Sequence, residues 1–208
     1  FNMNAGVDGT VDGGAKGANG DIINGVAGAA NNFVIASQNG GTVNGTTFAN
    51  VENLSGGAAV DNFTFNDALD GTASGLGDDD VFTINDGGSA GTIDGGTGTN
   101  DTVTYAGPGR TTAVVVAYDT FTNIESLIGS AQSDTLTGTG AADTFTVSST
   151  NTGTATLTAG GEVVGFTGFE NLSGLGGDDT FNMNAGVDGT VDGGANGANG
   201  DVINGVAG

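Results

Sequence analysis

Residues 1–28 read FNMNAGVDGTVDGGAKGANGDIINGVAG, and residues 181–208 repeat them with two changes, Lys16 to Asn196 and Ile22 to Val202. The second copy begins 180 residues after the first. Self-similarity at a fixed period is the signature of a repeat architecture, in which each stretch packs only on its neighbours. We therefore interpret residues 1–208 as one continuous segment of a longer repetitive chain, with a full unit at 1–180 and the next unit starting at 181.

The charge of the chain excludes several classes of partner. Asp and Glu number 24 against two basic residues, Lys16 and Arg110, with no His, which gives a net charge of −22. Such a charge repels nucleic acid and anionic membrane surfaces and attracts cations. No apolar run approaches the roughly 18 residues of a membrane-spanning helix. We expect no nucleic-acid partner and no membrane span. Because the chain has no cysteine, we expect backbone pairing and bound ions to hold the fold.

Five short segments share one pattern, an aromatic residue and an apolar residue separated by a single position. A period of two directs both side chains to the same face of a β-strand. An acid or amide precedes each aromatic residue by two positions, where we expect it in the turn that feeds the strand. The segments start at Phe33, Phe63, Phe82, Phe145 and Phe181, and the preceding residues are Asn31, Asp61, Asp80, Asp143 and Asp179.

A second signature, a Phe followed by a Glu and then a Leu, occurs at 48–54, 121–127 and 166–172. Its leading Phe always lies 15 residues before the apolar residue that follows the next Asp. A chain that winds in stacked turns, or rungs, needs a constant spacing between large apolar residues if the side chains of each rung are to stack on those of the rung beneath. The spacing therefore predicts a coil of regularly stacked rungs.

The residue types favour short strands over helices. No stretch keeps the i, i+3, i+4, i+7 apolar spacing of an amphipathic helix, and Gly, Thr, Asn and Asp are poor helix formers. Thr- and Val-rich strands between Gly-rich turns fit two architectures, a parallel β-solenoid and antiparallel sandwiches in series. The chain has no Trp, two Tyr and one Pro, which counts against sandwich cores and loops. We predict an all-β, parallel β-solenoid without helix, in which rungs of about 20 residues stack about 4.8 Å apart.

Several turns look like copies of the nonapeptide G-G-x-G-x-D-x-U-x, in which U is apolar; the closest are at 56–63, 75–82 and 174–181. Here the chain resembles the calcium-binding RTX repeats of large secreted bacterial proteins. The whole unit resembles the tandem repeats of giant surface proteins and adhesins of Gram-negative bacteria. This resemblance implies secretion, an extracellular or cell-surface location, and a role in adhesion or in a biofilm matrix.

The acidic turns are the candidate cation sites. Carboxylates about 5 Å apart on successive rungs repel by about 1 kcal/mol in water, and by more where water is partly excluded. Oxygen ligands from Asp and from backbone carbonyls suit Ca²⁺. The alternative is that these Asp residues only cap tight turns and keep the fibre soluble. The candidate ligands are Asp78, Asp79 and Asp80, then Asp178 and Asp179, followed by Asp61, Asp94 and Asp101.

Two other patterns admit different functions. Glu52, Glu125 and Glu170 recur at one motif position, which a polysaccharide lyase or epimerase could use as paired carboxylates, but a repeated position in a repeat protein is first a structural one. We assign no catalytic residue and expect no enzyme. Thr residues at alternate positions of 152–158 would line one strand face, as in ice-binding solenoids, although Thr also favours any solvent-facing strand.

The pattern as a whole predicts a structural or adhesive segment of an extracellular filament, stabilised by Ca²⁺. Its expected partners are copies of itself, joined end to end or laterally, together with cations and surface glycans. The alternative is a carbohydrate- or ice-binding solenoid module.

Overall fold

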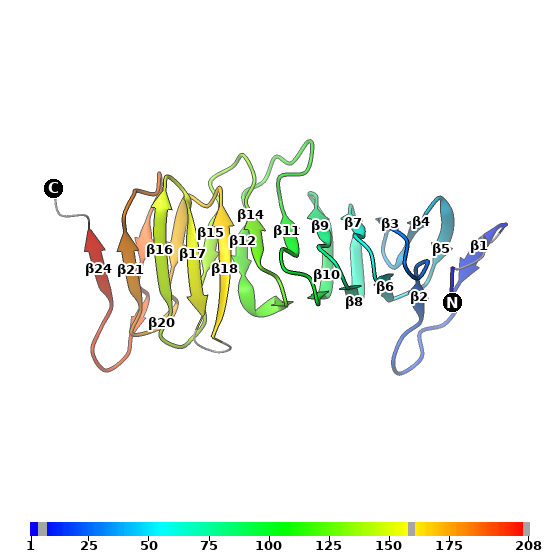
Figure 1. Cartoon of the computed structure of the whole chain (residues 1–208), viewed down its shortest axis with the longest axis horizontal. Coiled ribbons are helices and arrows are strands. Elements are labelled where there is room, and N and C mark those ends of the chain that lie inside the picture. Colours follow the sequence, from blue (N-terminus) through cyan, green and yellow to red (C-terminus); the bar gives the residue numbers. More distant parts are fainter. Residues whose placement is uncertain (4–7, 158–160, 206–208) are drawn as a thin grey trace. The chain divides into compact units, whose positions relative to one another are not determined.

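The computed structural model describes residues 1–3, 8–157 and 161–205 (Figure 1). These residues form β-strands and one short 3₁₀ helix, Tyr118–Thr120, and include no α-helix. None of their helical segments is long and apolar enough to cross a membrane. The chain divides into two compact units. The first contains Phe1–Arg110 with Thr120–Ile124, and the second contains Thr111–Asp119 with Glu125–Gly208.

The first unit contains two sheets. In spatial order the first sheet has β1 (Thr10–Asp12), β5 (Thr46–Ala49), β4 (Gly40–Val43), β3 (Asn32–Ser37), β7 (Asn62–Phe65), β9 (Val81–Ile84) and β11 (Thr102–Thr104). The second sheet has β2 (Ile22–Asn24), β6 (Asn53–Gly57), β8 (Ala68–Leu76), β10 (Ser89–Gly96) and β13 (Phe121–Thr122), all parallel. From β6 to β11 the chain visits the two sheets alternately, so each return adds one parallel strand to each sheet.

The second unit repeats this plan. Its first sheet has β14 (Ser126–Ile128), β18 (Glu162–Thr167), β17 (Thr152–Leu157), β16 (Thr144–Ser149), β21 (Thr180–Met183) and β24 (Val202–Gly205). Its second sheet has β12 (Val115–Ala117), β15 (Thr135–Thr137), β19 (Asn171–Ser173) and β22 (Val191–Asp192), again parallel. A small pair joins β20 (Gly176–Gly177) to β23 (Ala195–Asn196). The expectation of an all-β chain built mostly from parallel strands is confirmed.

Each unit also inserts one antiparallel strand, which corrects the expectation of parallel pairing throughout. Strand β4 runs antiparallel to β3 and β5, and β17 runs antiparallel to β16 and β18. The turn between β4 and β5 is Asn44-Gly45, with φ of 51° and 84°. Positive φ at both positions is the conformation of a two-residue hairpin turn, whose twist matches that of its strands. The Asn-Gly turn therefore reverses the direction of the chain between β4 and β5.

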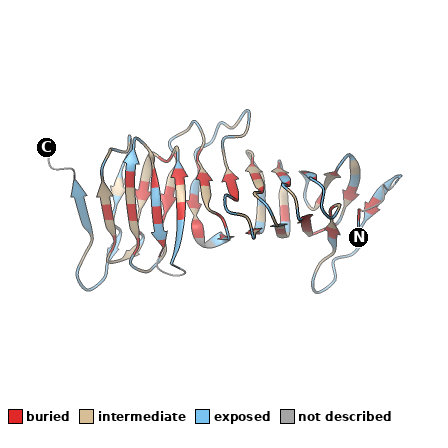
Figure 2. Ribbon diagram, in the orientation of Figure 1, coloured by how far each residue is buried: buried red, intermediate tan, exposed pale blue. Residues whose placement is uncertain are grey.

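The core is a set of stacked Phe side chains. Phe33, Phe63 and Phe82 lie on neighbouring parallel strands, with ring centroids 4.6 and 4.8 Å apart, and Phe145 stacks on Phe181 at 5.1 Å. All five are 0% exposed. Figure 2 shows buried and exposed positions alternating along many strands, as the pleat of a β-strand requires. Burial of each ring removes apolar surface from water and contributes about 1.5–3 kcal/mol.

Rung length is near the expected 20 residues only where no hairpin intervenes. Equivalent positions lie 19 residues apart from Asp61 to Asp80 and 21 from Asp80 to Asp101. The hairpins lengthen this to 30 residues from Asn31 to Asp61. The 15-residue spacing does not measure a rung: β5, which carries Phe48, and β7, which carries Phe63, belong to one sheet but are separated by β4 and β3.

Candidate functional site

Acidic side chains form a buried ladder in the first unit. Asp61, Asp80 and Asp101 are each 0% exposed, and Asn31 is 1% exposed. The backbone N–H of Asn31 donates to Asp61 Oδ1, that of Asp61 donates to Asp80 Oδ1 at 2.7 Å, and that of Asp80 donates to Asp101 Oδ1 at 2.7 Å. Each carboxylate therefore ties the turn of its own rung to the start of a neighbouring strand. We call this set the Asp ladder.

The second unit contains the same arrangement. The N–H of Asp143 donates to Asp179 Oδ1 at 2.8 Å, and the N–H of Asp179 donates to Asp201 Oδ1 at 2.9 Å. Asp134 is also buried, and its Oδ1 accepts the N–H of Val114 at 2.8 Å. The ladder is thus a property of the repeated turn rather than of one place in the chain.

The second oxygens of the ladder carboxylates differ in their surroundings. Asp61 Oδ2 accepts the N–H of Gly57, and Asp143 Oδ2 accepts the N–H of Thr139. Within the described part of the chain, Asp80 Oδ2 and Asp179 Oδ2 are buried without a hydrogen-bond partner. Burial raises the pKa of Asp80 to about 7 and also raises the pKa of Asp179, because a desolvated carboxylate is costly.

These two oxygens occur in turns of the same shape, at 75–80 and 174–179. Leu76 and Leu175 have φ of 82° and 67°, a left-handed conformation that is uncommon outside Gly. Both are about half exposed, at 49% and 50%. A Cβ on Gly75 would collide with Asp80 Oδ2 and lie 2.6 Å from the carbonyl oxygen of Gly95. Glycine at this position therefore leaves room for both oxygens.

Each of these turns also carries a partly exposed Asp that faces outward. Asp79 Oδ1 accepts the N–H of Thr99 at 2.8 Å and that of Asn100 at 3.0 Å. Asp178 Oδ1 accepts the N–H of Asn199 at 3.0 Å and that of Gly200 at 2.7 Å. Hydrogen bonds from these backbone groups lower the pKa of both carboxyls, because they favour the charged form.

The structure thus brings together only part of the predicted cation site. Asp61, Asp80 and Asp101 share one ladder, and Asp78 and Asp79 lie in the turn of Asp80. Asp178 and Asp179 form the equivalent turn in the second unit, whereas Asp94 lies on β10 and its Oδ1 accepts a hydrogen bond from Asn123 at 2.8 Å. No group of three or more His, Cys, Asp or Glu side chains among the described residues is arranged to hold a metal ion.

The buried Oδ2 atoms of Asp80 and Asp179 are nevertheless the kind of ligand that a hard cation prefers. A Cβ at Gly75 would meet both Asp80 Oδ2 and the Gly95 carbonyl oxygen, and one at Gly174 would meet both Asp179 Oδ2 and the Gly193 carbonyl oxygen. Ca²⁺ takes six to eight oxygen ligands. Since no three acidic side chains converge, carbonyl groups and water would have to supply most of them. Calcium binding by these turns stays a prediction.

Sequence reasoning missed part of the buried network. Glu52, 3% exposed, accepts the N–H of Asp21 at 2.9 Å through Oε2, and Glu170 accepts the N–H of Asp134 at 2.8 Å. The recurrence of these Glu residues was visible in the sequence, and the acid or amide two positions before each strand was the signal for the ladder. The burial of the carboxylates was not visible, because Asp is usually exposed.

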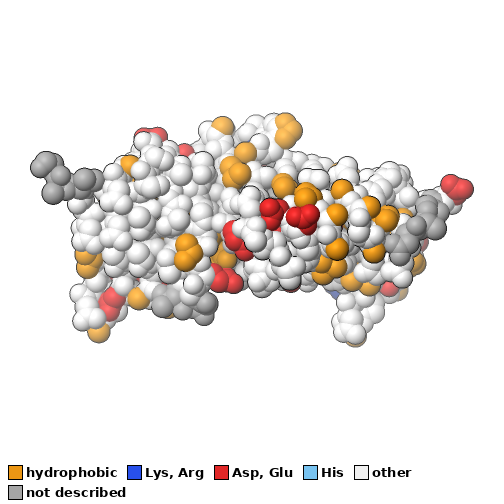
Figure 3. Space-filling view, viewed as in Figure 1, with side chains coloured by type: hydrophobic (Ala, Val, Ile, Leu, Met, Phe, Trp, Pro, Cys, Tyr) orange, Lys and Arg blue, Asp and Glu red, His pale blue; other side chains and the backbone are white. Residues whose placement is uncertain are grey.

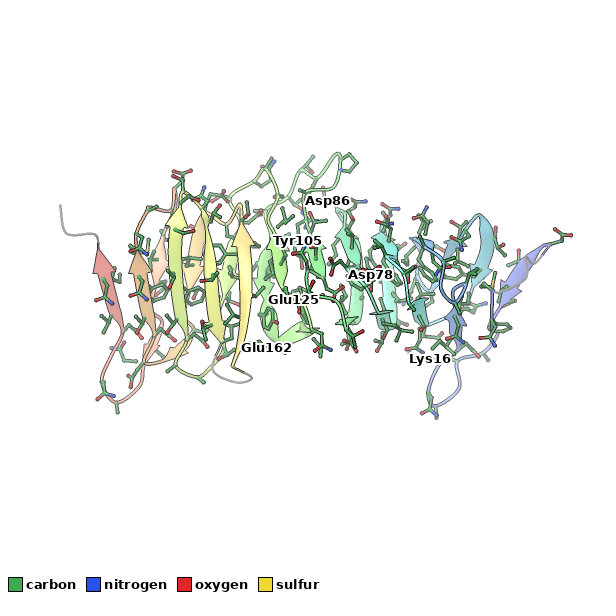
Figure 4. The ribbon with its side chains drawn as sticks, in the orientation of Figure 1. Lys16, Asp78, Asp86, Tyr105, Glu125 and Glu162 are labelled. Atoms are coloured by element: carbon green, nitrogen blue, oxygen red, sulfur yellow. The ribbon has the colours of Figure 1, made fainter. Side chains whose placement is uncertain are left out.

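The one arginine is engaged in packing. Arg110 donates from Nη1 to the carbonyl of Ile84 at 2.8 Å, its Nε lies 3.7 Å from Asp86 Oδ1, and its guanidinium lies 5.2 Å from the centre of the Tyr105 ring. Figure 4 labels Asp86 and Tyr105 in this region. On the face shown in Figure 3, acidic atoms are exposed at several places and basic atoms are almost absent.

A hollow of about 440 Å³ in the first unit is lined mainly by small residues of adjacent turns, including Gly25, Ser55, Gly57, Gly77 and Thr97. None of its lining residues that the structure describes is acidic or basic. It therefore offers backbone groups, hydroxyls and asparagine amides.

Neither a protein family model, nor a curated protein, nor a solved structure matches this chain. The resemblance to RTX repeats rests on the turn motifs alone, and the functional argument rests on the geometry described above.

Proposed function

We propose that this chain is a segment of an extracellular structural or adhesive filament, in which successive units of 180 residues continue as a β-solenoid. The observation that carries the proposal is that the recurrent residues make contacts between neighbouring rungs. The buried Phe rings stack on Phe rings of neighbouring strands, and the Asp carboxylates accept backbone N–H groups of neighbouring rungs. Glu52 and Glu170 likewise each accept the backbone N–H of an Asp. Residues repeated for catalysis would converge on one place, whereas residues repeated for support recur in every rung.

Parallel pairing in register supports a structure that extends along one direction. Phe63 pairs with Phe33 on one side and with Phe82 on the other, and the Asp ladder adds a second set of bonds along the same direction. Each rung contacts only its neighbours, so further units can be added without a new core. The alternation of the chain between two sheets is the path that a solenoid requires.

The composition and the turn motifs support an extracellular location. A chain with no cysteine and a net charge of −22 stays soluble at high local concentration because its surfaces repel one another. We propose secretion from a Gram-negative bacterium, a role at the cell surface or in a biofilm matrix, and Ca²⁺ bound beside Asp80 and Asp179. Surface glycans are the proposed targets of adhesion.

Electron microscopy of chains with two, four and six consecutive units tests the filament. The proposal predicts unbranched rods whose length grows by a constant increment per unit, because each unit adds the same number of rungs. Globular beads separated by flexible connections would contradict it. The proposed secretion and cell-surface location need a separate test, in which an antibody detects the intact chain on unbroken cells.

A row of hydroxyls favours a second candidate function, recognition of ice or of a flat polysaccharide. Cross-strand pairs in the first sheet of the first unit align seven residues on adjacent strands, six of them Thr. In spatial order they are Thr10, Thr47, Thr42, Val34, Thr64, Thr83 and Thr104. Neighbouring strands lie about 4.8 Å apart, so the row is a regular array. The expected row at 152–158 is shorter: Thr154 and Thr156 are exposed on β17, and Thr158 lies outside the described residues.

Inhibition of ice recrystallisation, or retention on insoluble polysaccharide, tests this candidate. Thr64→Lys with Thr83→Lys should abolish either activity by breaking the row. Thr72→Lys with Thr92→Lys, which alters one cross-strand pair of the second sheet, is the matched control and should retain it. Equal activity of both variants would remove the candidate.

A further inference from the structure

The segment that the chain repeats joins different sheets in its two copies. In the first copy, β1 pairs with β5 of the first sheet, and β2 pairs with β6 of the second sheet. In the second copy, the strand equivalent to β1 is β22, which pairs with β19 of the second sheet. The strand equivalent to β2 is β24, which pairs with β21 of the first sheet. Each strand of the segment thus belongs to one sheet in one copy and to the other sheet in the other copy.

The segment keeps the same internal pairing in both copies. Asn2 pairs with Asn24 in the first copy, and Asn182 pairs with Asn204 in the second. In each pair the Nδ2 of the later Asn donates to Oδ1 of the earlier one, at 2.8 Å and 2.9 Å. The second copy therefore forms the same rung as the first, and the first copy shows how the chain continues from it.

Continuation of the chain as a filament then exchanges the two sheets at each boundary between 180-residue units. The sheet that contains β16, β21 and β24 continues as β2, β6 and β8 of the next unit. The sheet that contains β15, β19 and β22 continues as β1, β5 and β4 of the next unit. The first sheet of a unit is therefore added to the second sheet of the unit before it.

The two sheets of the second compact unit have outer faces that point in opposite directions. Short connections join the sheets, at 138–143 between β15 and β16 and at 168–170 between β18 and β19. Phe145 of the first sheet and Leu136 and Leu172 of the second are at most 1% exposed. Each sheet therefore buries one face against the other, as packed layers require, and turns its second face outward.

Hydroxyl rows on either side of the boundary lie on these opposite faces. Before the boundary, Thr144 pairs with Thr156 and with Thr180 on the first sheet, and the pleat of β16 directs its unburied positions outward. After the boundary, the row of the next unit starts at Thr190, the equivalent of the first Thr in the row of the first compact unit. Thr190 Oγ1 donates to Asn171 Oδ1 at 3.0 Å, on the second sheet.

We propose that the filament carries hydroxyl rows on both of its faces, with a change of face at each unit boundary, and that it thereby joins two surfaces of a neutral, insoluble polysaccharide. The rows contain no carboxylate, whereas the net charge of −22 repels acidic polymers. Rows on both faces let one filament hold two surfaces, and further units strengthen each attachment through avidity. This proposal rests on the filament and hydroxyl-row functions and deepens them by assigning the arrangement of the partner.

Engineered cysteines in a chain of two consecutive units test the exchange of sheets, because the natural chain has no cysteine. Neighbouring strands are close enough for a disulfide. Asn204 pairs with Asn182, and its equivalent Asn24 pairs with Ser55. We expect Asn204→Cys to cross-link with Asn182→Cys in one variant, and with Ser55→Cys of the following unit in another. Asn204→Cys with Thr47→Cys of the following unit is the matched control and should not cross-link.

The second sheet gives an independent pair of links if one of these variants fails to fold. Asp192 pairs with Ser173, and its equivalent Asp12 pairs with Ala49. Asp192→Cys should therefore cross-link with Ser173→Cys, and with Ala49→Cys of the following unit. Electrophoresis without reducing agent reads each link. A link between Asn204→Cys and Thr47→Cys overturns the exchange, as does the absence of either expected link in both sheets.

Suspended cellulose microcrystals test the joining of two surfaces. In a two-unit chain, Lys replaces Thr64 and Thr83 of the first unit and Thr144 and Thr156 of the second, so that the rows flanking the boundary remain. We expect this chain to be retained on cellulose and to aggregate the crystals. Replacement of either remaining row by the same Lys pair should abolish aggregation and leave retention.

Thr72→Lys with Thr92→Lys in the second unit adds the same charge beside neither remaining row and should leave aggregation unchanged. Aggregation that survives the loss of one row overturns the proposal, as does retention without aggregation when both rows are present. Failure of the hydroxyl-row function looks different, because retention is then absent and the joining role falls with it, while the disulfides still form. Failure of the filament function appears as missing rods in microscopy, with the disulfides and retention intact.

Discussion

Asp61 and Asp80 occupy equivalent positions in consecutive rungs, but their carboxylates are used differently. Both oxygens of Asp61 accept backbone N–H groups, from Asn31 and from Gly57. Asp80 accepts the N–H of Asp61 through Oδ1, while its Oδ2 is buried and has no hydrogen-bond partner among the described residues. A buried oxygen without a donor is costly when the carboxyl is charged and less costly when the carboxyl is protonated.

This contrast predicts opposite effects of one substitution. In Asp61→Asn, either orientation of the amide turns its NH₂ group toward an N–H donor, so we expect a loss of about 1–3 kcal/mol of stability. In Asp80→Asn, the amide oxygen keeps the bond to Asp61 and the NH₂ replaces an oxygen that accepts no hydrogen bond, so stability should be unchanged or higher. Urea unfolding at pH 7 without divalent cations measures both. An equal loss at Asp80 would show that its second oxygen has a partner, such as a cation.

The pH dependence of stability checks the same assignment. The pKa of Asp80 is raised from 3.8 to about 7 in the folded chain, so the folded state binds this proton more tightly than the unfolded state. Its contribution is therefore fully present below about pH 4 and is lost as the pH rises to about 7. The free energy of unfolding of the unchanged chain, compared with that of Asp80→Asn, should fall over this interval. A difference that stays constant with pH would mean that Asp80 is ionised throughout.

At the scale of the strand, the Phe stack consists of some of the largest fully buried side chains. Phe63 lies between Phe33 and Phe82, with all three rings 0% exposed. Phe63→Ala should cost about 3–5 kcal/mol, because it leaves a cavity between two rings that cannot close it. Phe1→Ala, at a ring that is 51% exposed, is the matched control and should change stability by less than about 0.5 kcal/mol. Chemical unfolding followed by circular dichroism distinguishes the two, and similar losses would contradict the stack.

The strands themselves were predictable, since all five aromatic segments form strands, with Phe33 in β3, Phe63 in β7 and Phe82 in β9. The period of two is enough to place a side chain inside. It does not tell parallel from antiparallel pairing, because both orientations have the same pleat. Turns such as Asn44-Gly45 held part of that information, through the hairpin preference of the pair. Strand order was therefore less predictable than strand position.

The candidate site was likewise predictable only in part. The position of Asp80 before its strand was visible as part of the repeated pattern, but its burial depends on Gly75 and on the neighbouring rung that carries Gly95. Residues far apart in sequence determine that surrounding. The sequence therefore indicated which residues recur and could not show that Asp61 and Asp80 would differ in the partners of their second oxygens.

At the scale of the whole molecule, the net charge of −22 opposes the compact state by self-repulsion. Added salt screens exposed charges beyond about 10 Å at 0.1 M ionic strength, so NaCl should raise the midpoint of thermal unfolding. Bound Ca²⁺ would act in addition, since a ligand that binds only the folded state stabilises it by about 2.7 kcal/mol at 100 times its dissociation constant.

Calcium and sodium chlorides at matched ionic strength separate these effects. The proposed binding beside Asp80 and Asp179 predicts a higher unfolding midpoint in CaCl₂ than in NaCl, reversed by a chelator. Asp80→Asn with Asp179→Asn should remove that excess and leave the response to NaCl intact, because the remaining charges are screened as before. Equal midpoints in the two salts would limit the role of cations to screening. In that case the ladder hydrogen bonds and the Phe stack would have to hold the fold against its own charge without bound calcium.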